Sequence, residues 1–515
     1  MLSKKQEILS YFKYLQDKKP LAKLFRTDNF SYIFDTGTGK VVQCNDIEFT
    51  ILDIILSKKN LEESMNKLSA NINEKDFFTA MENVYNAIKE EDLLNVEVER
   101  KFHSPGHFNN LDQEINHNLR QIMLEVTERC NLRCHYCTYN DEYVPARNHG
   151  SKDMSLEVAY SAIDYLAAHG SKEEVYISFY GGEPLLMYDL IKKSVEYAKK
   201  TIKAKKINFN ITTNLTLITS EIAEFFSSIK NFCVVGSLDG PKHIHDKFRQ
   251  DINGIGSFDK ALSGLKKLVT AFDNSNNNKI LLSMVYTPPY SDNKLKEIKE
   301  FFNNLEWLPE SVGNFITYPE RNSIPLQYYN ENKPSNTKDT SLLDWSEKIF
   351  LNSILNNDST KTFTQDLTNT LLTRVHKREI SNKAHFSFPL NGCCIPGKQR
   401  VYISPNGEVR ICERVLGACS NGNVLSKIDT DKIKKVYVDD YKDVSLDTCS
   451  NCWISKVCSQ CYATSFEGGK FNIEKRNSYC DSAKENFLSA LKLYYKCYEH
   501  NPDSLLYLDT INIIS

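Results

Sequence analysis

Several features are scarce in this sequence of 515 residues, and each absence argues against a class of protein. No stretch reaches the roughly 18 consecutive apolar residues of a membrane-spanning helix, so we expect no membrane insertion. The opening residues break their apolar positions with charge instead of forming a secretory signal, which predicts a cytoplasmic location. A strong net charge is also missing. The formal charge of −2 and the isoelectric point near 6.6 give no field that would gather nucleic acid or an anionic membrane.

Cysteine, in contrast, is abundant, and its 15 residues gather in two groups. Three cysteines lie between Cys130 and Cys137, and nine lie between Cys393 and Cys480. Because disulfides are rare in reducing compartments, clustered cysteines in such a chain favour metal binding. The length exceeds that of one ordinary hydrophobic core and predicts about two to four domains.

The first of these domains is predicted over residues 1–110. Its expected elements are a hairpin at residues 30–44, helices that begin near Asn45, Asn60 and Asn73, and a closing strand around Val96 and Val98. The outline is that of a winged helix.

Strand-like apolar runs then alternate with amphipathic helices over residues 116–320. The candidate strands are Ile122–Thr127, Val175–Tyr180, Ile207–Thr212, Phe232–Leu238 and Ile280–Tyr286. This alternation predicts an α/β fold, a parallel sheet partly closed into a TIM-like (β/α)6 barrel with its active site at the C-terminal strand ends. A linker with two bridging helices is expected at 321–390, and a cysteine-rich domain that ends in a helix is expected at 391–515.

The first cysteine group directly follows the first candidate strand. Cys130, Cys134 and Cys137 have the spacing C-x3-C-x2-C. Three thiolates on one short loop are able to hold three irons of a [4Fe–4S] cluster and leave the fourth iron without a protein ligand. A zinc loop is the alternative that spacing alone leaves open.

With Tyr136 before its third cysteine and its place after the first barrel strand, this loop resembles that of the radical S-adenosylmethionine (SAM) superfamily. The resemblance implies that the open iron binds SAM and that one electron from the cluster releases a 5′-deoxyadenosyl radical. It makes Cys130, Cys134 and Cys137 catalytic residues as well as metal ligands.

Further segments resemble the SAM contacts of that superfamily. Tyr180–Pro184 looks like the GGEP motif, whose backbone receives the SAM amino group, and the segments at 212–214 and 237–241 look like those that contact the ribose and carboxylate. The cofactor-binding residues that the resemblance implies are Tyr136, Gly181, Gly182, Glu183, Thr212, Asn214, Ser237, Asp239 and Arg249. Leu215 departs from the usual glycine. An ordinary turn at 181–184 and an exposed helix arginine at 249 are the alternatives.

The second cysteine group resembles the seven-cysteine SPASM domain of peptide-modifying radical SAM enzymes. That likeness implies an outer auxiliary [4Fe–4S] cluster on Cys449, Cys452, Cys458 and Cys480, and an inner one on Cys394, Cys412 and Cys461. With the first loop this makes three clusters. Cys393, Cys419 or a substrate cysteine are candidates for the fourth inner ligand. A zinc ribbon on Cys449, Cys452, Cys458 and Cys461 is the alternative.

The N-terminal domain carries no basic footprint for nucleic acid, since residues 1–101 hold 15 Lys and Arg against 17 Asp and Glu. In front of such an enzyme it resembles a RiPP recognition element, which binds the leader of a ribosomally made precursor peptide as an added strand. The hairpin at 30–44 and the helix at 74–90 would form the groove. A purely structural cap is the alternative.

The stretch Cys412–Val415 is a further likeness to maturases that form thioethers. It implies a bond from a cysteine sulfur to a carbon of another residue, with Glu413 as a proton acceptor or else a mere surface residue. The implied partners are a precursor peptide and an electron donor, flavodoxin or ferredoxin. The competing functions are an anaerobic sulfatase maturase that makes formylglycine, a peptide epimerase or carbon–carbon crosslinker, and a winged-helix regulator that senses iron–sulfur status.

Overall fold

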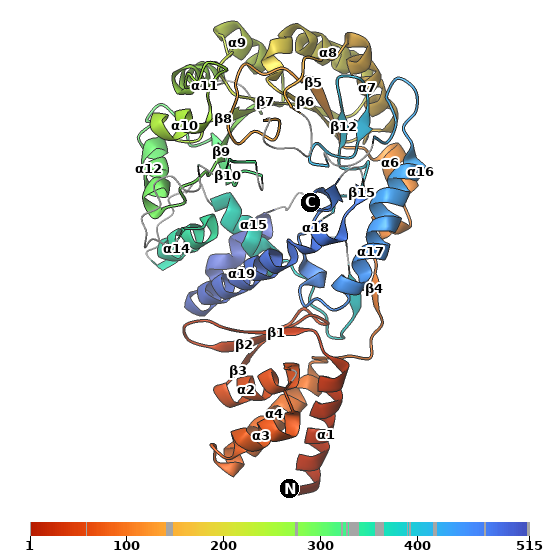
Figure 1. The fold of residues 1–515 in the computed structure, drawn as a ribbon, viewed down its shortest axis with the longest axis vertical. Coiled ribbons are helices and arrows are strands. Elements are labelled where there is room, and N and C mark those ends of the chain that lie inside the picture. Colours follow the sequence, from red (N-terminus) through yellow and green to blue (C-terminus); the bar gives the residue numbers. More distant parts are fainter. Residues whose placement is uncertain are drawn as a thin grey trace.

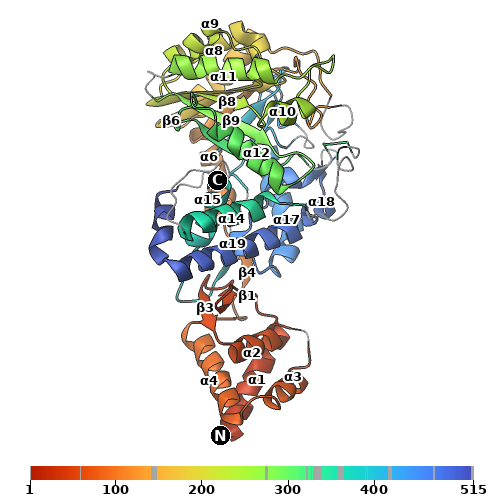
Figure 2. The ribbon, with the colours of Figure 1, turned by 90° about the vertical axis from the view of Figure 1, so that its left-hand side faces the viewer.

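The three parts of the molecule are stacked along its long axis in this computed structural model (Figures 1 and 2). The N-terminal domain lies at one end, the barrel at the other, and most of the C-terminal region between them. The structure describes residues 2–57, 59–140, 148–272, 277–320, 323–325, 328, 339–355, 365–388, 390, 393–415, 420–467 and 470–511.

The N-terminal domain is a three-stranded antiparallel sheet backed by four helices. Its elements are α1 (Leu2–Lys18), β1 (Ala22–Arg26), β2 (Ser31–Asp35), β3 (Val41–Cys44), α2 (Asp46–Leu56), α3 (Leu61–Ser69) and α4 (Glu74–Glu90), with sheet order β1-β2-β3. The expected hairpin and three of the helices are confirmed. Asn45, Asn60 and Asn73 each accept a backbone N–H at a helix start, which satisfies a donor that the helix cannot pair itself. The sequence did not predict α1 and β1.

The closing strand expected around Val96 and Val98 is wrong, because residues 95–99 are irregular. Val96 packs against the core of the N-terminal domain, whereas Val98 packs beside Phe386 and Phe388. The two valines therefore serve two different cores. The next strand, β4 (Arg100–Phe102), pairs in parallel with β11 (Phe386–Phe388) from far along the chain, and α5 (Pro105–Phe108) and α6 (Leu111–His117) lead into the barrel.

The barrel is an open parallel sheet whose outer face is covered by helices (Figure 1). Its strands are β5 (Gln121–Thr127), β6 (Glu174–Gly181), β7 (Lys206–Thr213), β8 (Phe232–Ser237), β9 (Lys279–Val285) and β10 (Gly313–Thr317). Its helices are α7 (Leu156–His169), η1 (Pro184–Met187), α8 (Tyr188–Thr201), α9 (Ser220–Ser228), α10 (Lys242–Phe248), α11 (Phe258–Phe272) and α12 (Asp292–Asn303). All five predicted strands are confirmed, and β10 adds a sixth.

The C-terminal region contains the two expected bridging helices and the expected closing helix. Its elements are α14 (Leu342–Leu355), α15 (Gln365–His376), β11, β12 (Val401–Ile403), β13 (Val409–Arg410), α16 (Thr430–Lys434), η2 (Lys435–Asp439), α17 (Asp440–Cys449), η3 (Ser455–Val457), η4 (Tyr462–Thr464), β14 (Phe466–Glu467), β15 (Lys470–Phe471), α18 (Ile473–Asn477), α19 (Cys480–His500) and η5 (Pro502–Thr510). Strand β12 pairs in parallel with β5, so the barrel sheet continues across the boundary drawn at residue 391. Among the described helices, none is both long and apolar enough to cross a membrane.

The N-terminal sheet is docked on the C-terminal region, because β2 and its turn are buried there. The Thr36 hydroxyl donates to the Trp453 carbonyl at 2.7 Å, and the Lys456 ammonium donates to the Gly37 carbonyl at 3.1 Å. The Phe34 ring meets the ring of Trp453 with centroids 6.0 Å apart. The loop between Cys452 and Cys458 therefore supports the hairpin directly, and the two domains do not form independent units.

Candidate active site

The three cysteines of the first group line one cavity at the C-terminal ends of the barrel strands. Strand β5 ends at Thr127, and Cys130, Cys134 and Cys137 follow on the next loop. The other residues that line the cavity are Leu132, Tyr136, Thr138, Tyr139, His149, Tyr180, Gly181, Gly182, Thr212, Thr213, Asn214, Ser237 and Arg249. Seven of the nine implied cofactor contacts are thus brought together. Tyr139, His149 and Tyr180 are lining residues that sequence reasoning did not assign.

The thiols of this loop sit in an apolar environment that keeps them protonated when no metal is bound. Burial raises the pKa of Cys130 and Cys134 to about 12, and that of Cys137 to about 11. Metal binding must therefore displace these protons, as thiolate ligands require. The Cys130 sulfur already accepts the N–H of Leu132 at 3.4 Å, an orientation that suits a metal-bound thiolate.

The glycines of the GGEP-like segment let two backbone segments approach each other closely. Gly181 has φ of +137°, and a Cβ there would lie 2.3 Å from the Thr127 carbonyl oxygen. At Gly182 a Cβ would lie 2.0 Å from the Arg129 carbonyl oxygen. Any side chain would push this segment away from the cysteine loop. The two glycines therefore allow this segment to pack closely on the cysteine loop, and both line the cavity.

Glu183 is not among the residues that line the cavity, and its implied contact with SAM stays a prediction. Its side chain is buried and accepts three hydrogen bonds, from the Thr213 hydroxyl at 2.8 Å and from the N–H groups of Asn214 and Leu185 at 2.8 and 3.1 Å. Burial raises the pKa of Glu183 to about 7, although the three hydrogen bonds act to lower it. Glu183 therefore ties the loop after β6 to the loop after β7 and positions Asn214.

Leu215 adopts the left-handed conformation that glycine favours, with φ of +68°. Its side chain is fully buried and lies where Gly236 leaves room, since a Cβ at Gly236 would lie 2.8 Å from it. The departure from the usual glycine is thus accommodated by a neighbouring glycine. Asn214 keeps its place, because its amide donates to the Asn131 side chain at 2.8 Å, beside Cys130.

Arg249 is buried, so the exposed-helix alternative is wrong. Its guanidinium forms a two-point contact with Asp239, with Nε to Oδ2 at 2.8 Å and one Nη to Oδ1 at 3.1 Å. The Tyr136 hydroxyl also donates to Oδ2, at 2.6 Å. Asp239 does not line the cavity, and its carboxylate faces these partners, so its implied contact with SAM stays a prediction. The network fixes the residue just before Cys137.

The four cysteines assigned to the outer cluster are neighbours in space. Burial is the main cause of the raised pKa of Cys449, Cys452 and Cys458, and the charges of neighbouring thiols add to it. Cys480 acts in this way on both Cys449 and Cys452. The Cys449 sulfur accepts from the Arg476 guanidinium at 2.9 Å, and the Cys458 sulfur accepts the Gln460 N–H at 3.4 Å.

The inner group gathers around an ion pair next to the barrel. Arg400 donates to both Glu413 oxygens, at 2.6 and 2.7 Å, and to the Gln121 side chain of β5 at 3.0 Å. The charge of Glu413 raises the pKa of Cys394, Cys412 and Cys461, after the larger effect of burial. The three assigned ligands therefore share one neighbourhood.

Cys393 is held differently from its neighbour Cys394. Its thiol is buried and donates to the Gln460 carbonyl at 3.6 Å, as a neutral thiol does. Both Cys393 and Cys394 lie near Cys461, and Cys394 lies near Arg400 as well. The choice of Cys394 over Cys393 as the inner ligand stays a prediction. Cys419, a candidate for the fourth inner ligand, lies outside the described residues.

Glu413 is not a surface residue, because only 13% of its side chain is exposed. The Cys412 thiol donates to its Oε2 at 3.1 Å. Burial opposes ionisation, yet Arg400 lowers the pKa of Glu413 below its ordinary value. The side chain is thus a carboxylate at neutral pH, and it contacts a predicted ligand. Burial raises the pKa of Tyr180, the charges of Glu413 and Cys412 raise it further, and Tyr180 also lines the cavity that contains the first cysteine loop.

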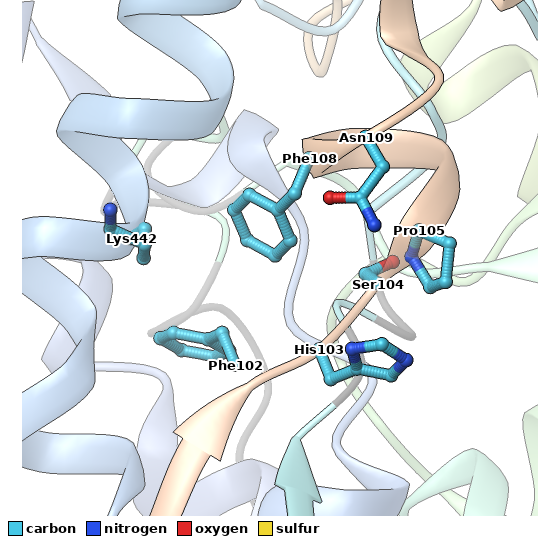
Figure 3. Close-up of a pocket in the computed structure, with 7 residues that line it drawn as sticks. All are labelled: Phe102, His103, Ser104, Pro105, Phe108, Asn109 and Lys442. Carbon is cyan, nitrogen blue, oxygen red and sulfur yellow. The ribbon is translucent and has the colours of Figure 1, made fainter.

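A second cavity lies where β4 meets α5, and Figure 3 shows its lining. The residues are Phe102, His103, Ser104, Pro105, Phe108, Asn109 and Lys442, the last of them on α17. None was predicted as a site residue. Nearby, His107 has Nε2 at 3.2 Å from the Cys394 carbonyl oxygen. This cavity is separate from the one that contains the first cysteine loop.

The thiols of the first loop suit a [4Fe–4S] cluster, because three cysteines on one short loop can each bind a different iron. In the described part of the chain, no three His, Cys, Asp or Glu side chains converge as ligands of one metal ion. A zinc ion holds each thiolate about 2.3 Å from one centre, whereas a [4Fe–4S] cluster binds each thiolate to a different iron. The cavity lining in turn offers SAM exposed backbone at Gly181 and polar side chains at Asn214 and Ser237.

Comparison with known proteins agrees with this geometry. Residues 124–302 match the family described as "Radical SAM superfamily". The cysteine-type anaerobic sulfatase-maturating enzyme of Clostridium novyi is 35% identical over 155 residues, which are 29% of this chain and 40% of that protein. The radical SAM cyclopropyl synthase TigE of Paramaledivibacter caminithermalis is 25% identical over 319 residues, 59% of this chain and 62% of that protein. The chain therefore spans less than two thirds of either relative.

The solved structure of native anSMEcpe with bound AdoMet has the same fold. It superposes with a TM-score of 0.52 at 21% sequence identity and covers 76% of this chain and 100% of that one. The family match spans β5 to α12, the strands and helices that surround the cavity. The chain therefore carries a radical SAM domain over residues 124–302, the domain of a superfamily of SAM-dependent iron–sulfur enzymes.

Proposed function

We propose that this protein is a radical SAM peptide maturase that installs thioethers in a ribosomally made precursor peptide. The observation that carries the proposal is the placement of the inner cysteine group. Glu413 and Cys412 lie near Tyr180, and Tyr180 lines the cavity that contains Cys130, Cys134 and Cys137. A peptide in that cavity would have the radical source on one side and the inner cysteines on the other. The named relatives include sulfatase-maturating enzymes, which supports a polypeptide substrate.

The implied cofactors would supply the radical, and the residues of the chain would position the reacting groups. When bound, a [4Fe–4S] cluster on the first loop and SAM supply the 5′-deoxyadenosyl radical. The chain contributes position: the Arg249–Asp239 pair holds Tyr136, and the Gly181–Gly182 backbone frames the cavity. Holding the acceptor carbon and the sulfur together favours bond formation over quenching of a carbon radical.

The bond-forming step has a defined balance. The acceptor carbon gives up a hydrogen atom to the deoxyadenosyl radical, the substrate thiol gives up a proton, and one carbon–sulfur bond forms. One electron leaves the product, and an auxiliary cluster held by the inner or outer cysteines would accept it. Glu413 is placed to take the proton, because it is a carboxylate beside the inner cysteines. Each crosslink should lower the mass of the peptide by about two units.

The test is mass spectrometry of a cysteine-containing precursor after anaerobic reaction. A thioether leaves the donor cysteine unreactive to iodoacetamide and survives reductant, which a disulfide does not. Cys412→Ala should abolish crosslinking and still leave some 5′-deoxyadenosine formation. A loss of about 18 mass units at one cysteine would instead indicate formylglycine, the alternative that the sulfatase-maturating relatives favour.

The metal content gives an independent check. Anaerobically reconstituted protein should hold about 12 iron and 12 sulfide, the sum of three [4Fe–4S] clusters. Replacing Cys130, Cys134 and Cys137 together by alanine should remove about four of each and abolish SAM cleavage. Full iron retention in that variant would contradict the assignment of the first loop.

The N-terminal sheet offers an edge for peptide recognition. Among the described strands β3 pairs with β2 alone, so its outer edge is open. The Asp35 N–H donates to the Lys40 carbonyl at 2.9 Å, and this bond fixes which backbone N–H groups of β3 point toward β2. The N–H of Val42 points toward β2, whereas the N–H groups of Val41 and Gln43 point outward. A leader peptide that adds as a strand would accept those N–H groups.

A proline at Gln43 tests this edge without removing the domain. Gln43→Pro deletes one outward N–H and spares the bonds to β2, whereas Gln43→Ala is the matched control. We expect the proline variant to bind full-length precursor at least about tenfold more weakly, the effect of 1.4 kcal/mol, with unchanged iron content. Equal affinity of the two variants would contradict the edge-strand proposal. Deleting residues 1–110 is a poor test, because β2 and β4 pack on or pair with the C-terminal region.

A further inference from the structure

The outer cysteine group lies beside a buried arginine. Arg476 belongs to α18, and only 3% of the residue is exposed. Its guanidinium donates to the Cys449 sulfur at 2.9 Å, to the Asn477 side-chain oxygen at 3.1 Å and to the Tyr441 hydroxyl at 3.4 Å. None of these partners, which all lie in the described part of the chain, is a carboxylate. Because an unpaired buried charge is costly, the site favours an anion beside Arg476.

A second arginine approaches the same group from another helix. Arg374 on α15 is half-buried and lies close enough to Cys458 for their charges to interact. Among the described residues, its guanidinium has no hydrogen-bond or ion-pair partner. Lys484 is also near the group, but the Asp481 carboxylate pairs with it at 3.1 Å and offsets its charge. Two arginines that lack a carboxylate partner in the described chain therefore lie beside the outer group.

The inner cysteine group has no such excess of positive charge. Arg400 is paired with both oxygens of Glu413, and the Cys412 thiol donates to the same carboxylate at 3.1 Å. Arg414 is near as well, but 77% of its side chain is exposed, so water and salt screen its charge. The two groups therefore have different electrostatic surroundings, although both consist of cysteine thiols.

We propose that Arg476 and Arg374 are positioning residues that make the outer group, once loaded with its cluster, the site where the electron released by thioether formation is held; this rests on the function proposed above. A cluster core bound by four thiolates is an anion, and an added electron makes it more negative. A nearby cation stabilises the more negative state and so raises the reduction potential of the site. At the inner group the Glu413 carboxylate offsets the cation, so no comparable gain is expected there. The electrons balance, because the product loses one as the carbon–sulfur bond forms and the outer site gains one.

The experiment measures the reduction potentials of the two auxiliary sites. The background is the full-length variant whose three first-loop cysteines are alanine, reconstituted anaerobically, so that only the inner and outer groups hold iron, about eight atoms per chain. Reduction is followed by electron paramagnetic resonance at a series of fixed potentials. Arg476→Gln, Arg476→Lys and Arg374→Gln are compared in this background with the matched control Arg378→Gln. Arg378 is also half-buried, and its guanidinium donates to two backbone carbonyls and a tyrosine hydroxyl but to no cysteine.

Arg476→Gln should lower the higher of the two potentials by about 59 mV or more, a tenfold change in a one-electron equilibrium, and leave the lower potential unchanged. Arg476→Lys, which keeps the charge, should recover most of this shift. Arg374→Gln should change the same equilibrium at least about twofold in the same direction, and the control should change neither potential.

Unchanged potentials in Arg476→Gln at full iron content, an equal shift in the control, or a shift of the lower potential instead would overturn the proposal. If Arg476→Gln lost iron, an unchanged potential in Arg374→Gln would still overturn it. A background variant that held no cluster at all would refute the function proposed above and this proposal with it. Full iron content with unchanged potentials would refute the role of the arginines alone.

Discussion

Replacing Asp239 by asparagine is the sharpest test of how the barrel holds its cysteine loop. The side chains of Arg249 and Asp239 are 8% and 2% exposed, so the substitution leaves a guanidinium buried without its charge partner. It also weakens the bond from the Tyr136 hydroxyl, one residue before Cys137. Breaking one partner of a buried ion pair costs about 3–5 kcal/mol.

That cost should appear as a large fall in thermal stability. For a domain of this size, each 1 kcal/mol lowers the melting temperature by roughly 2–4 °C, so Asp239→Asn should lower it by roughly 6–20 °C. The matched control is Glu173→Gln, which breaks an ion pair with Lys205 whose side chains are 71% and 75% exposed. An exposed pair contributes about 0–1 kcal/mol, so the control should melt close to wild type. Differential scanning fluorimetry under anaerobic conditions compares the two.

The pH dependence of thermal stability is a second test of the Asp239–Arg249 pair. Burial opposes ionisation of Asp239, but Arg249 lowers its pKa below the ordinary value. The stabilisation from this carboxylate is therefore present above the unfolded pKa of about 3.9 and is lost only as pH falls through the lower folded value. Between pH 5 and 8 the gap between Asp239→Asn and wild type should stay constant. If Asp239→Asn melted within about 2 °C of Glu173→Gln, the reasoning about this network would be refuted.

Three further substitutions test separate contacts. Gly181→Ala should abolish SAM binding, measured by equilibrium dialysis, because its Cβ would meet the Thr127 carbonyl oxygen; wild-type binding would refute this. Leu215→Ala should lower the free energy of unfolding by about 2–5 kcal/mol in urea titrations, since its side chain is fully buried; a change below about 1 kcal/mol would contradict the packing. Thr36→Val removes the bond to the Trp453 carbonyl and should speed proteolytic release of the N-terminal domain about fivefold, for a loss near 1 kcal/mol.

The chemistry-bearing residues could be predicted from the sequence because their signal is local. The spacing of Cys130, Cys134 and Cys137 and the strand run before it are contiguous in the chain, and the barrel strands follow from apolar periodicity. Asn45, Asn60 and Asn73 are likewise local signals of helix starts.

Other features depend on partners far apart in sequence, and only the folded chain reveals them. The motifs predict Asp239 and Glu183 as ligand contacts. In the structure each carboxylate accepts hydrogen bonds from protein groups in other segments of the chain. The periodicity of apolar residues did not predict that β12 would pair with β5 and extend the barrel sheet. The strand predicted at Val96 and Val98 is wrong, because the alternation of apolar and charged residues does not show which hydrophobic core each side chain joins.

The sequence by itself determined the spacing of the cysteines and the order of the strands and helices, since these reside in residue identity and short-range patterns. Tertiary structure alone decided how the modules meet. The turn at Thr36 is buried on the loop between Cys452 and Cys458, although hundreds of residues separate them in the chain. The same holds for Glu413, which is a buried carboxylate only because Arg400 reaches it from the end of the barrel sheet. Burial and pairing of charge are properties of packing between segments, and no local pattern of residues encodes them.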